Sequence, residues 1–491
     1  MAPIAHFDES KIVLDSTFTR DLCLVGGAWI GADSGAVLDV TDPATGAIIG
    51  RVPDLSAAET IRAVDAATAA LPDWAGRPAA ERARILRRFF DLMIGHQEAL
   101  ATILTAEQGK PIAEARGEIA YAAAFMEWFG EEAKRVYGDI IPSNLPGRRL
   151  FVQKQPVGVV AAITPWNFPA AMITRKIGPA LAAGCTIVVK PAAETPLSAL
   201  ALGVIGELAG LPAGVLNIVT GDPKAIGGVL TNDPRVRKLS FTGSTRTGRL
   251  LLEQCAASVK KTSMELGGNA PFLVFDDADV DAAVEGTIAS KFRNAGQTCV
   301  CTNRIYAQAG IYDLFVEKLA AAAACLKMGH GLTAGSVIGP LITEKAVQKV
   351  EEHLADAVAG GATVLTGGSR DDNANLFFPP TVVRDVTPDM LVCREETFGP
   401  LAAVVKFETE EEAVALANES EFGLAGYFYS RDLARAWRVA EALECGMVGV
   451  NTGLLSTEVA PFGGVKQSGL GREGSRYGIE DYIETKYICM A

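Results

Sequence analysis

The stretch Val157-Gly-Val-Val-Ala-Ala-Ile-Thr-Pro-Trp-Asn-Phe-Pro169 contains the unit from which the middle of the chain is built. A short run of small and branched apolar residues ends in a polar turn, and a helical stretch follows at residues 170–183. The order repeats downstream, with strand candidates at 186–189, 215–219, 238–241 and 262–266 and helix candidates at 197–209, 225–230 and 245–257. Such alternation is typical of a parallel α/β sheet.

Polar or glycine-rich segments follow these strand candidates directly. Beside the turn that ends at Pro169, they are Lys190-Pro-Ala-Ala-Glu194, Gly221-Asp-Pro223, Thr242-Gly-Ser-Thr245 and Gly267-Gly-Asn269. In open parallel sheets, ligands bind beyond the carboxyl ends of the strands. The five segments therefore predict one ligand-binding crevice.

A second alternating section, from Pro271-Phe-Leu-Val-Phe275 to about Gly464, predicts another α/β sheet. Its strand candidates are 304–308, 363–366, 401–407 and 446–451, and its helix candidates are 280–293, 311–327, 346–359, 410–417 and 434–442. Before the first sheet, apolar periodicity predicts mainly helices, at 57–71 and 79–104, and residues 139–155 predict an extended hairpin.

Composition excludes several classes of protein. A formal charge of −13 over 491 residues disfavours nucleic acid and anionic membranes as partners. No apolar run reaches the roughly 18 residues of a membrane span, and residues 1–9 do not resemble a secretion signal. Nine scattered cysteines and four scattered histidines predict neither a disulfide framework nor a metal site. We expect a cytoplasmic protein that binds small molecules.

Three side chains in the predicted crevice carry groups that can take part in a reaction. Cys299 lies in a loop next to small polar residues and is either an accessible nucleophile or a buried small hydrophobe. Glu265 ends a strand beside two glycines and is either a general base or a surface carboxylate. Asn167 carries an amide that could donate to an oxyanion, or simply belongs to a turn.

Two glycine-rich runs mimic nucleotide-binding motifs. Gly469-Leu-Gly-Arg-Glu-Gly474 matches the dinucleotide fingerprint letter for letter, but it follows no convincing strand and a loop is expected instead. Gly243 to Gly248 lacks the lysine of a P-loop, which excludes nucleoside triphosphate hydrolysis of that type.

Taken together, the motifs resemble the aldehyde dehydrogenase superfamily over nearly the whole chain. Within it, residues 292–301 and 469–475 resemble the succinate-semialdehyde dehydrogenases. The motifs that carry the resemblance are Thr164-Pro-Trp-Asn-Phe-Pro169, Phe241-Thr-Gly-Ser-Thr245, Met264-Glu-Leu-Gly-Gly-Asn269, Gly296-Gln-Thr-Cys299, Glu395-Glu-Thr-Phe-Gly-Pro400 and Pro461-Phe-Gly-Gly464.

The resemblance implies a role for each reactive side chain. Cys299 attacks the aldehyde, and Asn167 with the Cys299 backbone N–H holds the oxyanion of the thiohemiacetal. Transfer of a hydride to the nicotinamide leaves a thioester, and Glu265 activates the water that releases the acid. The CoA-acylating branch of the family lacks this glutamate, so hydrolysis is expected here.

The resemblance also implies a dinucleotide site. Ala193 occupies a position where strict NAD enzymes place a glutamate, which grips the ribose and repels a 2′-phosphate. We therefore expect NADP to be preferred and NAD to be accepted, although Glu194 lies next door. The cofactor-binding residues implied are Trp166, Asn167, Lys190, Ala193, Gly243, Ser244, Leu266, Glu396 and Phe398.

For the substrate, the resemblance implies an aldehyde with a distal carboxylate. Arg175 and Arg293 match the positions that hold the carboxylate, and Ser456 matches a supporting hydroxyl; structural ion pairing is the alternative for each arginine. Succinate semialdehyde is the expected substrate. Glutarate semialdehyde, another short aldehyde, or a cysteine-dependent esterase reaction are the alternatives. Cys301 resembles the second cysteine of a redox pair with Cys299.

The fold that the resemblance implies is α/β, with two doubly wound parallel-sheet domains and a small β oligomerisation unit. Residues 1–138 and 156–265 would form the cofactor-binding domain, and residues 266–470 the catalytic domain. Residues 139–155 and 471–491 would form the oligomerisation unit of a dimer or tetramer.

Overall fold

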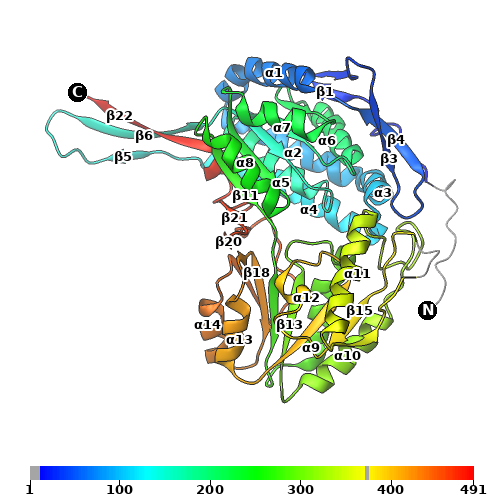
Figure 1. The fold of residues 1–491 in the computed structure, drawn as a ribbon. Coiled ribbons are helices and arrows are strands. Elements are labelled where there is room, and N and C mark those ends of the chain that lie inside the picture. Colours follow the sequence, from blue (N-terminus) through cyan, green and yellow to red (C-terminus); the bar gives the residue numbers. More distant parts are fainter. Residues whose placement is uncertain (1–11, 371–374) are drawn as a thin grey trace.

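The computed structural model describes residues 12–370 and 375–491 and arranges them as two α/β units, one above the other in Figure 1. The expectation of no export signal rests on residues 1–9, which lie outside the described residues. Within the described ranges, no helix is long and apolar enough to cross a membrane.

The first unit is built on an eight-stranded sheet with the order β2-β1-β9-β8-β7-β10-β11-β21. Its five central strands are parallel, as predicted, and antiparallel strands complete both edges. The central strands are β7 (Val159–Ile163), β8 (Thr186–Lys190), β9 (Leu216–Ile218), β10 (Val236–Thr242) and β11 (Lys261–Glu265).

Both faces of this sheet are buried, which explains its uninterrupted apolar strands. In β7, Val160 and Ala162 face one hydrophobic cluster, while Val159 and Ala161 face another on the opposite side. Helices cover the two faces: α1 (Ala57–Gly76), α2 (Ala79–Gly95), α4 (Ile112–Glu132), α5 (Ala171–Ala183), α6 (Pro196–Ala209), α7 (Pro223–Asn232) and α8 (Thr245–Ala256).

The predictions for the N-terminal region were wrong in two places. The single helix expected at 79–104 is broken at His96 (φ −117°, ψ 23°), so that α2 is followed by α3 (Gln97–Gln108). Four strands were also missed, because strands of three to six residues show too few alternations to be recognised. They are β1 (Cys23–Val25), β2 (Ala28–Ile30), β3 (Val37–Thr41) and β4 (Ile48–Pro53).

The second unit has a seven-stranded sheet that is parallel except for its edge strand β14, with the order β14-β15-β16-β13-β12-β18-β19. Together with the first sheet, it confirms the predicted fold class; strands β15 and β18 were not predicted. The strands are β12 (Ala270–Val274), β13 (Thr302–Gln308), β14 (Thr363–Thr366), β15 (Thr381–Arg384), β16 (Leu401–Phe407), β18 (Ala425–Tyr429) and β19 (Met447–Val450).

The helices of this unit follow the predicted alternation and lie around its sheet (Figure 1). The principal ones are α9 (Val280–Lys291), α10 (Tyr312–Ala324), α11 (Glu344–Ala359), α13 (Glu410–Asn418) and α14 (Leu433–Ala442).

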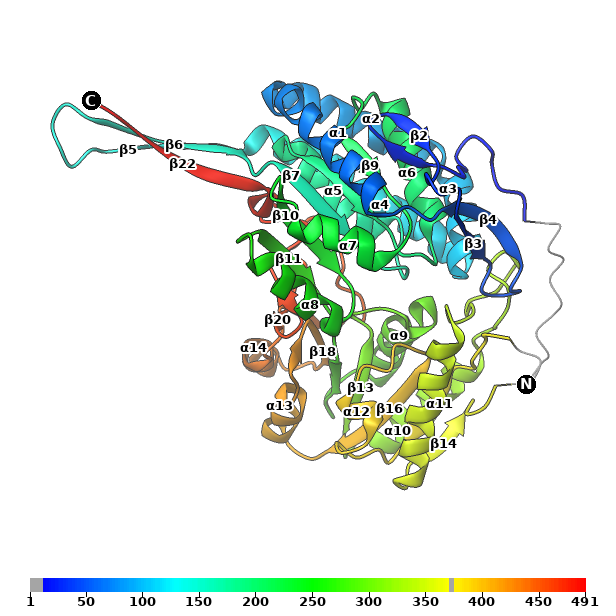
Figure 2. The ribbon, with the colours of Figure 1, turned by 45° about the horizontal axis from the view of Figure 1, so that its top comes forward.

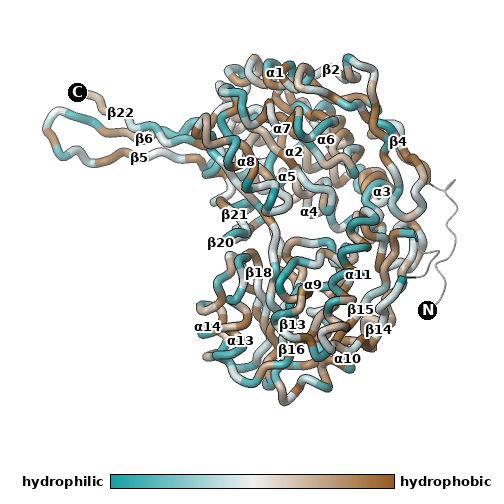
Figure 3. Tube along the Cα trace, in the orientation of Figure 1, coloured by the Kyte–Doolittle hydropathy of each residue, from teal (hydrophilic) through white to brown (hydrophobic). Residues whose placement is uncertain are grey.

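A three-stranded arm projects from the first unit (Figures 1 and 2). It contains the predicted hairpin, β5 (Asp139–Ile141) and β6 (Arg149–Pro156), to which β22 (Ile483–Met490) adds a third strand. Apolar segments alternate with polar ones along the arm (Figure 3), and Ile140 is 80% exposed. Ahead of β22 in the chain, β21 (Gly469–Leu470) pairs with β11 of the first sheet. The division into domains and the oligomerising role of the arm stay predictions.

Candidate active site

Cys299 lies in the loop between α9 and β13. Asn294, Ala295 and Gly296 there have φ values of 52°, 55° and 77°, a run of left-handed backbone that residues with a Cβ rarely adopt. A Cβ on Gly296 would lie 2.2 Å from the Gly399 carbonyl oxygen. Such strain is typical of functional loops whose path is imposed by their surroundings. Cys299 is half-buried and unoxidised, and burial raises the pKa of its thiol to about 12.

Asn167 reaches this loop from the turn after β7. Its side-chain Nδ2 donates to the Gln297 carbonyl at 3.1 Å, two residues before Cys299. Its Oδ1 accepts the backbone N–H of Phe168 at 3.1 Å. The primary amide carries two N–H donors, so one remains for a ligand. The predicted nucleophile and the predicted oxyanion donor are therefore brought together.

Glu265 is the last residue of β11 and is only 4% exposed. Neither of its carboxylate oxygens has a hydrogen-bond partner among the described residues. Burial raises its pKa well above the usual carboxyl range, the neighbouring Glu473 raises it further, and Arg175 opposes the shift. A buried carboxyl of this kind suits general base catalysis near neutral pH. The charges of Glu265 and Arg175 also act on the pKa of Cys299, so the three groups share one electrostatic environment.

Glu473 was not recognised from the sequence. Its Oε1 contacts the Lys176 ammonium, and its Oε2 lies 3.1 Å from Arg175 Nε. The arginine also stacks on Phe462, 3.8 Å from the ring centroid. Arg175 therefore has an ionic partner within the protein. Its predicted contact with a substrate carboxylate stays a prediction.

A pocket of about 290 Å³ brings Arg293 and Ser456 together. The Arg293 guanidinium lies over the Phe168 ring at 4.9 Å, and Phe168 follows Asn167 directly. A guanidinium with a hydroxyl beside it can bind a carboxylate. The pocket is lined by Glu114, Gly117, Glu118, Tyr121, Phe168, Arg293 and Ser456; Arg175 is not among them.

Two of the predicted cofactor-binding residues, Gly243 and Ser244, lie at the N-terminus of α8. Ser244 caps the helix by accepting from the Thr247 N–H at 3.4 Å. The buried Thr245 hydroxyl oxygen has no hydrogen-bond partner in the described part of the chain. A Cβ on Gly267 would lie 3.4 Å from that oxygen and 3.1 Å from Glu396 Oε2. A helix N-terminus with a free hydroxyl and a glycine beside it fits a dinucleotide phosphate. Gly243 precedes the cap, and Leu266 packs beneath Gly248.

Glu396 and Phe398 come from the second unit, and Phe398 meets Trp166, which follows β7 of the first unit. Glu396 Oε1 accepts the Gly268 N–H at 3.2 Å, and burial raises its pKa to about 7. Phe398, with a left-handed φ of 56°, meets Trp166 edge-on at 5.6 Å. These groups fit the ribose and nicotinamide end of the same cofactor.

At the adenosine end, Lys190 is buried and its ammonium donates to the Pro191 carbonyl at 3.0 Å. Burial lowers its pKa, while the charge of Glu194 opposes the shift. Ala193 is exposed and presents only a methyl group. The position therefore has room for a 2′-phosphate.

Cys301, the predicted redox partner, is buried, and its thiol lies 3.6 Å from the Lys291 carbonyl oxygen. Burial raises its pKa. Disulfide formation with Cys299 stays a prediction.

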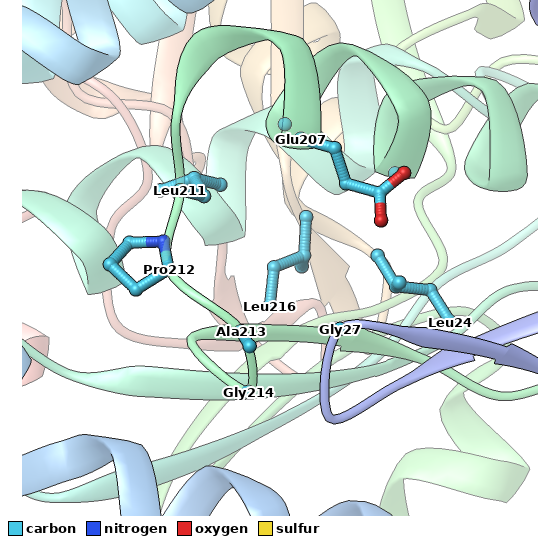
Figure 4. A pocket seen from close by; sticks show the side chains of 10 residues that line it. Leu24, Gly27, Glu207, Leu211, Pro212, Ala213, Gly214 and Leu216 are labelled. Carbon is cyan, nitrogen blue, oxygen red and sulfur yellow. The ribbon is translucent and has the colours of Figure 1, made fainter.

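Another pocket, of about 260 Å³, lies where β9 begins (Figure 4). The predicted cofactor-binding residues of the first unit lie at or just after the other, carboxyl ends of its parallel strands. Figure 4 shows mainly aliphatic side chains and glycines around it. Its one acidic residue, Glu207, accepts from the Trp29 indole N–H at 2.9 Å. The pocket holds none of the predicted site residues.

Comparison with known proteins identifies the family of the chain. The family model described as "Aldehyde dehydrogenase family" matches residues 29–488. Glutarate-semialdehyde dehydrogenase of Pseudomonas aeruginosa is 62% identical over 97% of this chain and 99% of its own length. Succinate-semialdehyde dehydrogenase [NADP(+)] of Escherichia coli is 61% identical, with the same coverage. The crystal structure of succinate-semialdehyde dehydrogenase from Burkholderia pseudomallei superposes with a TM-score of 0.96 at 63% identity, covering 97% of this chain and 99% of that one.

Proposed function

Because the chain belongs to the aldehyde dehydrogenase family, we propose that it uses NAD(P) to oxidise succinate semialdehyde to succinate. The observation that carries the choice of substrate is the pocket in which Arg293 and Ser456 lie beside Phe168, next to Asn167. A four-carbon semialdehyde has its aldehyde at one end and its carboxylate at the other. The carboxylate pairs with Arg293 while the aldehyde carbon reaches Cys299.

The reaction follows from the arrangement of three side chains. The Cys299 thiol releases its proton to water as Sγ attacks the aldehyde carbon, and the Asn167 amide and the Cys299 N–H donate to the oxyanion of the thiohemiacetal. Bound NAD(P) supplies the hydride acceptor. Its phosphates would be held by Gly243 and Ser244, its nicotinamide ribose by Glu396, and its ring beside Trp166 and Phe398. Glu265 then takes a proton from the water that hydrolyses the thioester.

Glutarate semialdehyde is the second candidate, favoured by the 62% identity to the Pseudomonas aeruginosa enzyme. It is one methylene longer, and a methylene changes specificity by only about 1–3 kcal/mol. A steady-state panel of succinate semialdehyde, glutarate semialdehyde and butanal, each with NAD and NADP, tests the proposal. Absorbance at 340 nm separates oxidation from ester hydrolysis. A higher kcat/KM for butanal than for both semialdehydes would contradict it.

We expect Arg293→Ala to raise KM for succinate semialdehyde by about 10- to 100-fold, because a charged hydrogen bond in a pocket is worth about 1.5–3 kcal/mol. KM for butanal, which has no carboxylate, should change little. Arg293→Lys is the matched control and should recover part of the loss, since it keeps the charge without the planar fork. Equal effects of Arg293→Ala on both aldehydes would show that the arginine is structural.

We expect the enzyme to prefer NADP and Ala193→Glu to reverse that preference. A carboxylate beside Lys190 would repel the 2′-phosphate and could accept hydrogen bonds from the ribose hydroxyls of NAD. The variant should lower kcat/KM with NADP by about tenfold or more, an effect of roughly 1.4 kcal/mol. Ala193→Gln, similar in size but neutral, is the control. A higher kcat/KM of the unaltered enzyme with NAD would contradict the expectation.

We also infer that the chain forms a homodimer or tetramer through the arm of β5, β6 and β22. The exposed apolar side chains of Ile140 and Tyr487 support this. A cytoplasmic location is supported by the nine cysteines, all unpaired in the described parts of the chain.

A further inference from the structure

Lys110 and Glu118 form a buried ion pair that the proposed reaction does not use. Lys110 Nζ lies 2.6 Å from Glu118 Oε2, and the two side chains are 0% and 1% exposed. Removing two charges from water costs several kcal/mol per ion, which their attraction often only repays. A contribution to stability is therefore a weak explanation for such a pair. The segment that the pair holds in place indicates its role better.

In the described part of the chain, the other side-chain hydrogen bonds of the pair lead to one short segment, 167–171. The Lys110 ammonium donates to the Asn167 carbonyl at 2.7 Å and lies 3.9 Å from the centre of the Phe168 ring. Glu118 Oε1 accepts the backbone N–H groups of Ala170 and Ala171 at 3.0 and 3.3 Å. The lysine thus holds the beginning of the segment, and the glutamate holds its end.

The start of α5 explains why Glu118 is needed there. Ala170 occupies the N-cap position, and its methyl side chain accepts no hydrogen bond from the first turn of the helix. The first N–H groups of a helix require acceptors, and a negative charge near them is favourable. Glu118, on α4, supplies both from outside the helix. The turn between β7 and α5 is thereby fixed at its helical end.

The Asn167 backbone is fixed from a second side as well. Its carbonyl also accepts from Asn294 Nδ2 at 3.0 Å, and its own Nδ2 bonds to the Gln297 carbonyl. Lys110 and Asn294 therefore donate to the same carbonyl oxygen, and Asn294 belongs to the Cys299 loop. With that carbonyl held by two donors, the backbone that carries the Asn167 side chain is fixed before a substrate arrives.

We propose that Lys110 and Glu118 are positioning residues that act through Asn167, holding its side-chain amide where the oxyanion forms. The inference rests on the oxyanion role assigned to Asn167 in the proposed function. Oxyanion stabilisation depends on donors placed in advance, and a displacement of about 1 Å can lower a rate by about 100-fold. Loss of the pair therefore lowers kcat by displacing the Asn167 amide.

A double-mutant cycle tests the proposal. Lys110→Met and Glu118→Gln are made together, so that no buried charge is left unpaired, in the unaltered enzyme and in the Asn167→Ala variant. In the unaltered enzyme, we expect the paired change to lower the single-turnover rate of NADPH formation by about 100-fold. In the Asn167→Ala background, we expect it to lower that rate by less than about threefold. Hydrolysis of p-nitrophenyl acetate, which forms a similar oxyanion on the thiol, should follow the same pattern.

Two controls accompany the cycle. The titration of the Cys299 thiol should not change in the paired variant. Lys260→Met removes another buried lysine, whose ammonium donates to the carbonyls of Asp233 and Val236, and it should retain full activity. If the paired variant does not fold, Lys110→Met alone enters the same cycle, because the Glu118 carboxylate keeps the two α5 amides as partners while the Asn167 carbonyl loses its donor.

The outcomes separate this inference from the proposed function. If Asn167→Ala alone leaves the single-turnover rate intact, its oxyanion role is wrong and the positioning role is overturned with it. If Asn167→Ala lowers the rate and the paired change lowers it by the same factor in both backgrounds, the pair does not act through Asn167. That result overturns only the positioning role and leaves the proposed reaction standing.

Discussion

Replacement of Cys299 by Ala is expected to abolish NADPH formation, with a fall in kcat of at least about 10⁴-fold, because the neighbouring thiol of Cys301 is buried against the Lys291 carbonyl. The substitution removes one sulfur atom from a half-buried position and should leave the fold intact. The measurement is the rate of absorbance increase at 340 nm with saturating succinate semialdehyde and NADP.

Cys325→Ala is the matched control, because Cys325 is also an unpaired cysteine but is exposed at the end of α10. It should retain full activity. Binding of NADPH to the Cys299→Ala variant, followed by fluorescence, should be preserved, since the thiol does not belong to the phosphate or ribose contacts. An active Cys299→Ala enzyme would refute the assignment of the nucleophile.

Glu265→Gln is expected to separate the two halves of the reaction. Without the carboxylate, hydrolysis of the thioester should slow by about 10²- to 10⁴-fold, while attack by Cys299 and the redox step continue. Rapid mixing should show a burst of about one NADPH per site, followed by a slow steady state. Glu285→Gln, which alters an exposed carboxylate on α9, should show normal turnover.

The pH dependence of the same variant gives a second measure. The pKa of Glu265 is raised by burial and by Glu473, so the base is protonated over part of the range in which an ordinary carboxyl is already charged. The deacylation rate of the unaltered enzyme should rise with pH as Glu265 loses its proton above the usual carboxyl range. In Glu265→Gln this rise should be absent. A missing burst would instead mean that Glu265 acts before the thioester forms.

Much of the architecture was predictable because parallel strands buried on two faces have long apolar runs. Residues 157–163, for example, are all apolar or glycine, so they indicate a strand whichever face of it is buried. The strand β7 occupies most of this range. The short strands β1 and β2 have no such run, and their place at the sheet edge depends on β9, far along the chain. The break at His96 was missed because the apolar periodicity continues through it.

For the site, the sequence provided the reactive groups but not their support. Cys299, Glu265 and Asn167 each belong to a local motif, so short stretches were enough to select them. The partners of Lys176 and Lys110 lie on other elements, and only the tertiary fold brings Glu473 and the Asn167 carbonyl to them. Arg175 illustrates the difference: from sequence alone, a substrate carboxylate and Glu473 are equally acceptable partners.

The contacts of Glu473 make assembly of the site depend on the order in which the ribosome makes the chain. Lys176 is synthesised 297 residues before its partner Glu473, and the edge of β11 stays open until Gly469 and Leu470 have been made. Until then, Lys176 and Arg175 are cations without their carboxylate, and burying them unpaired costs several kcal/mol. Closing the nascent first unit around α5 in its final form therefore carries this cost until residue 473 has been made. A chain released before residue 473 contains Cys299, Glu265 and Asn167 and yet lacks the environment in which they work.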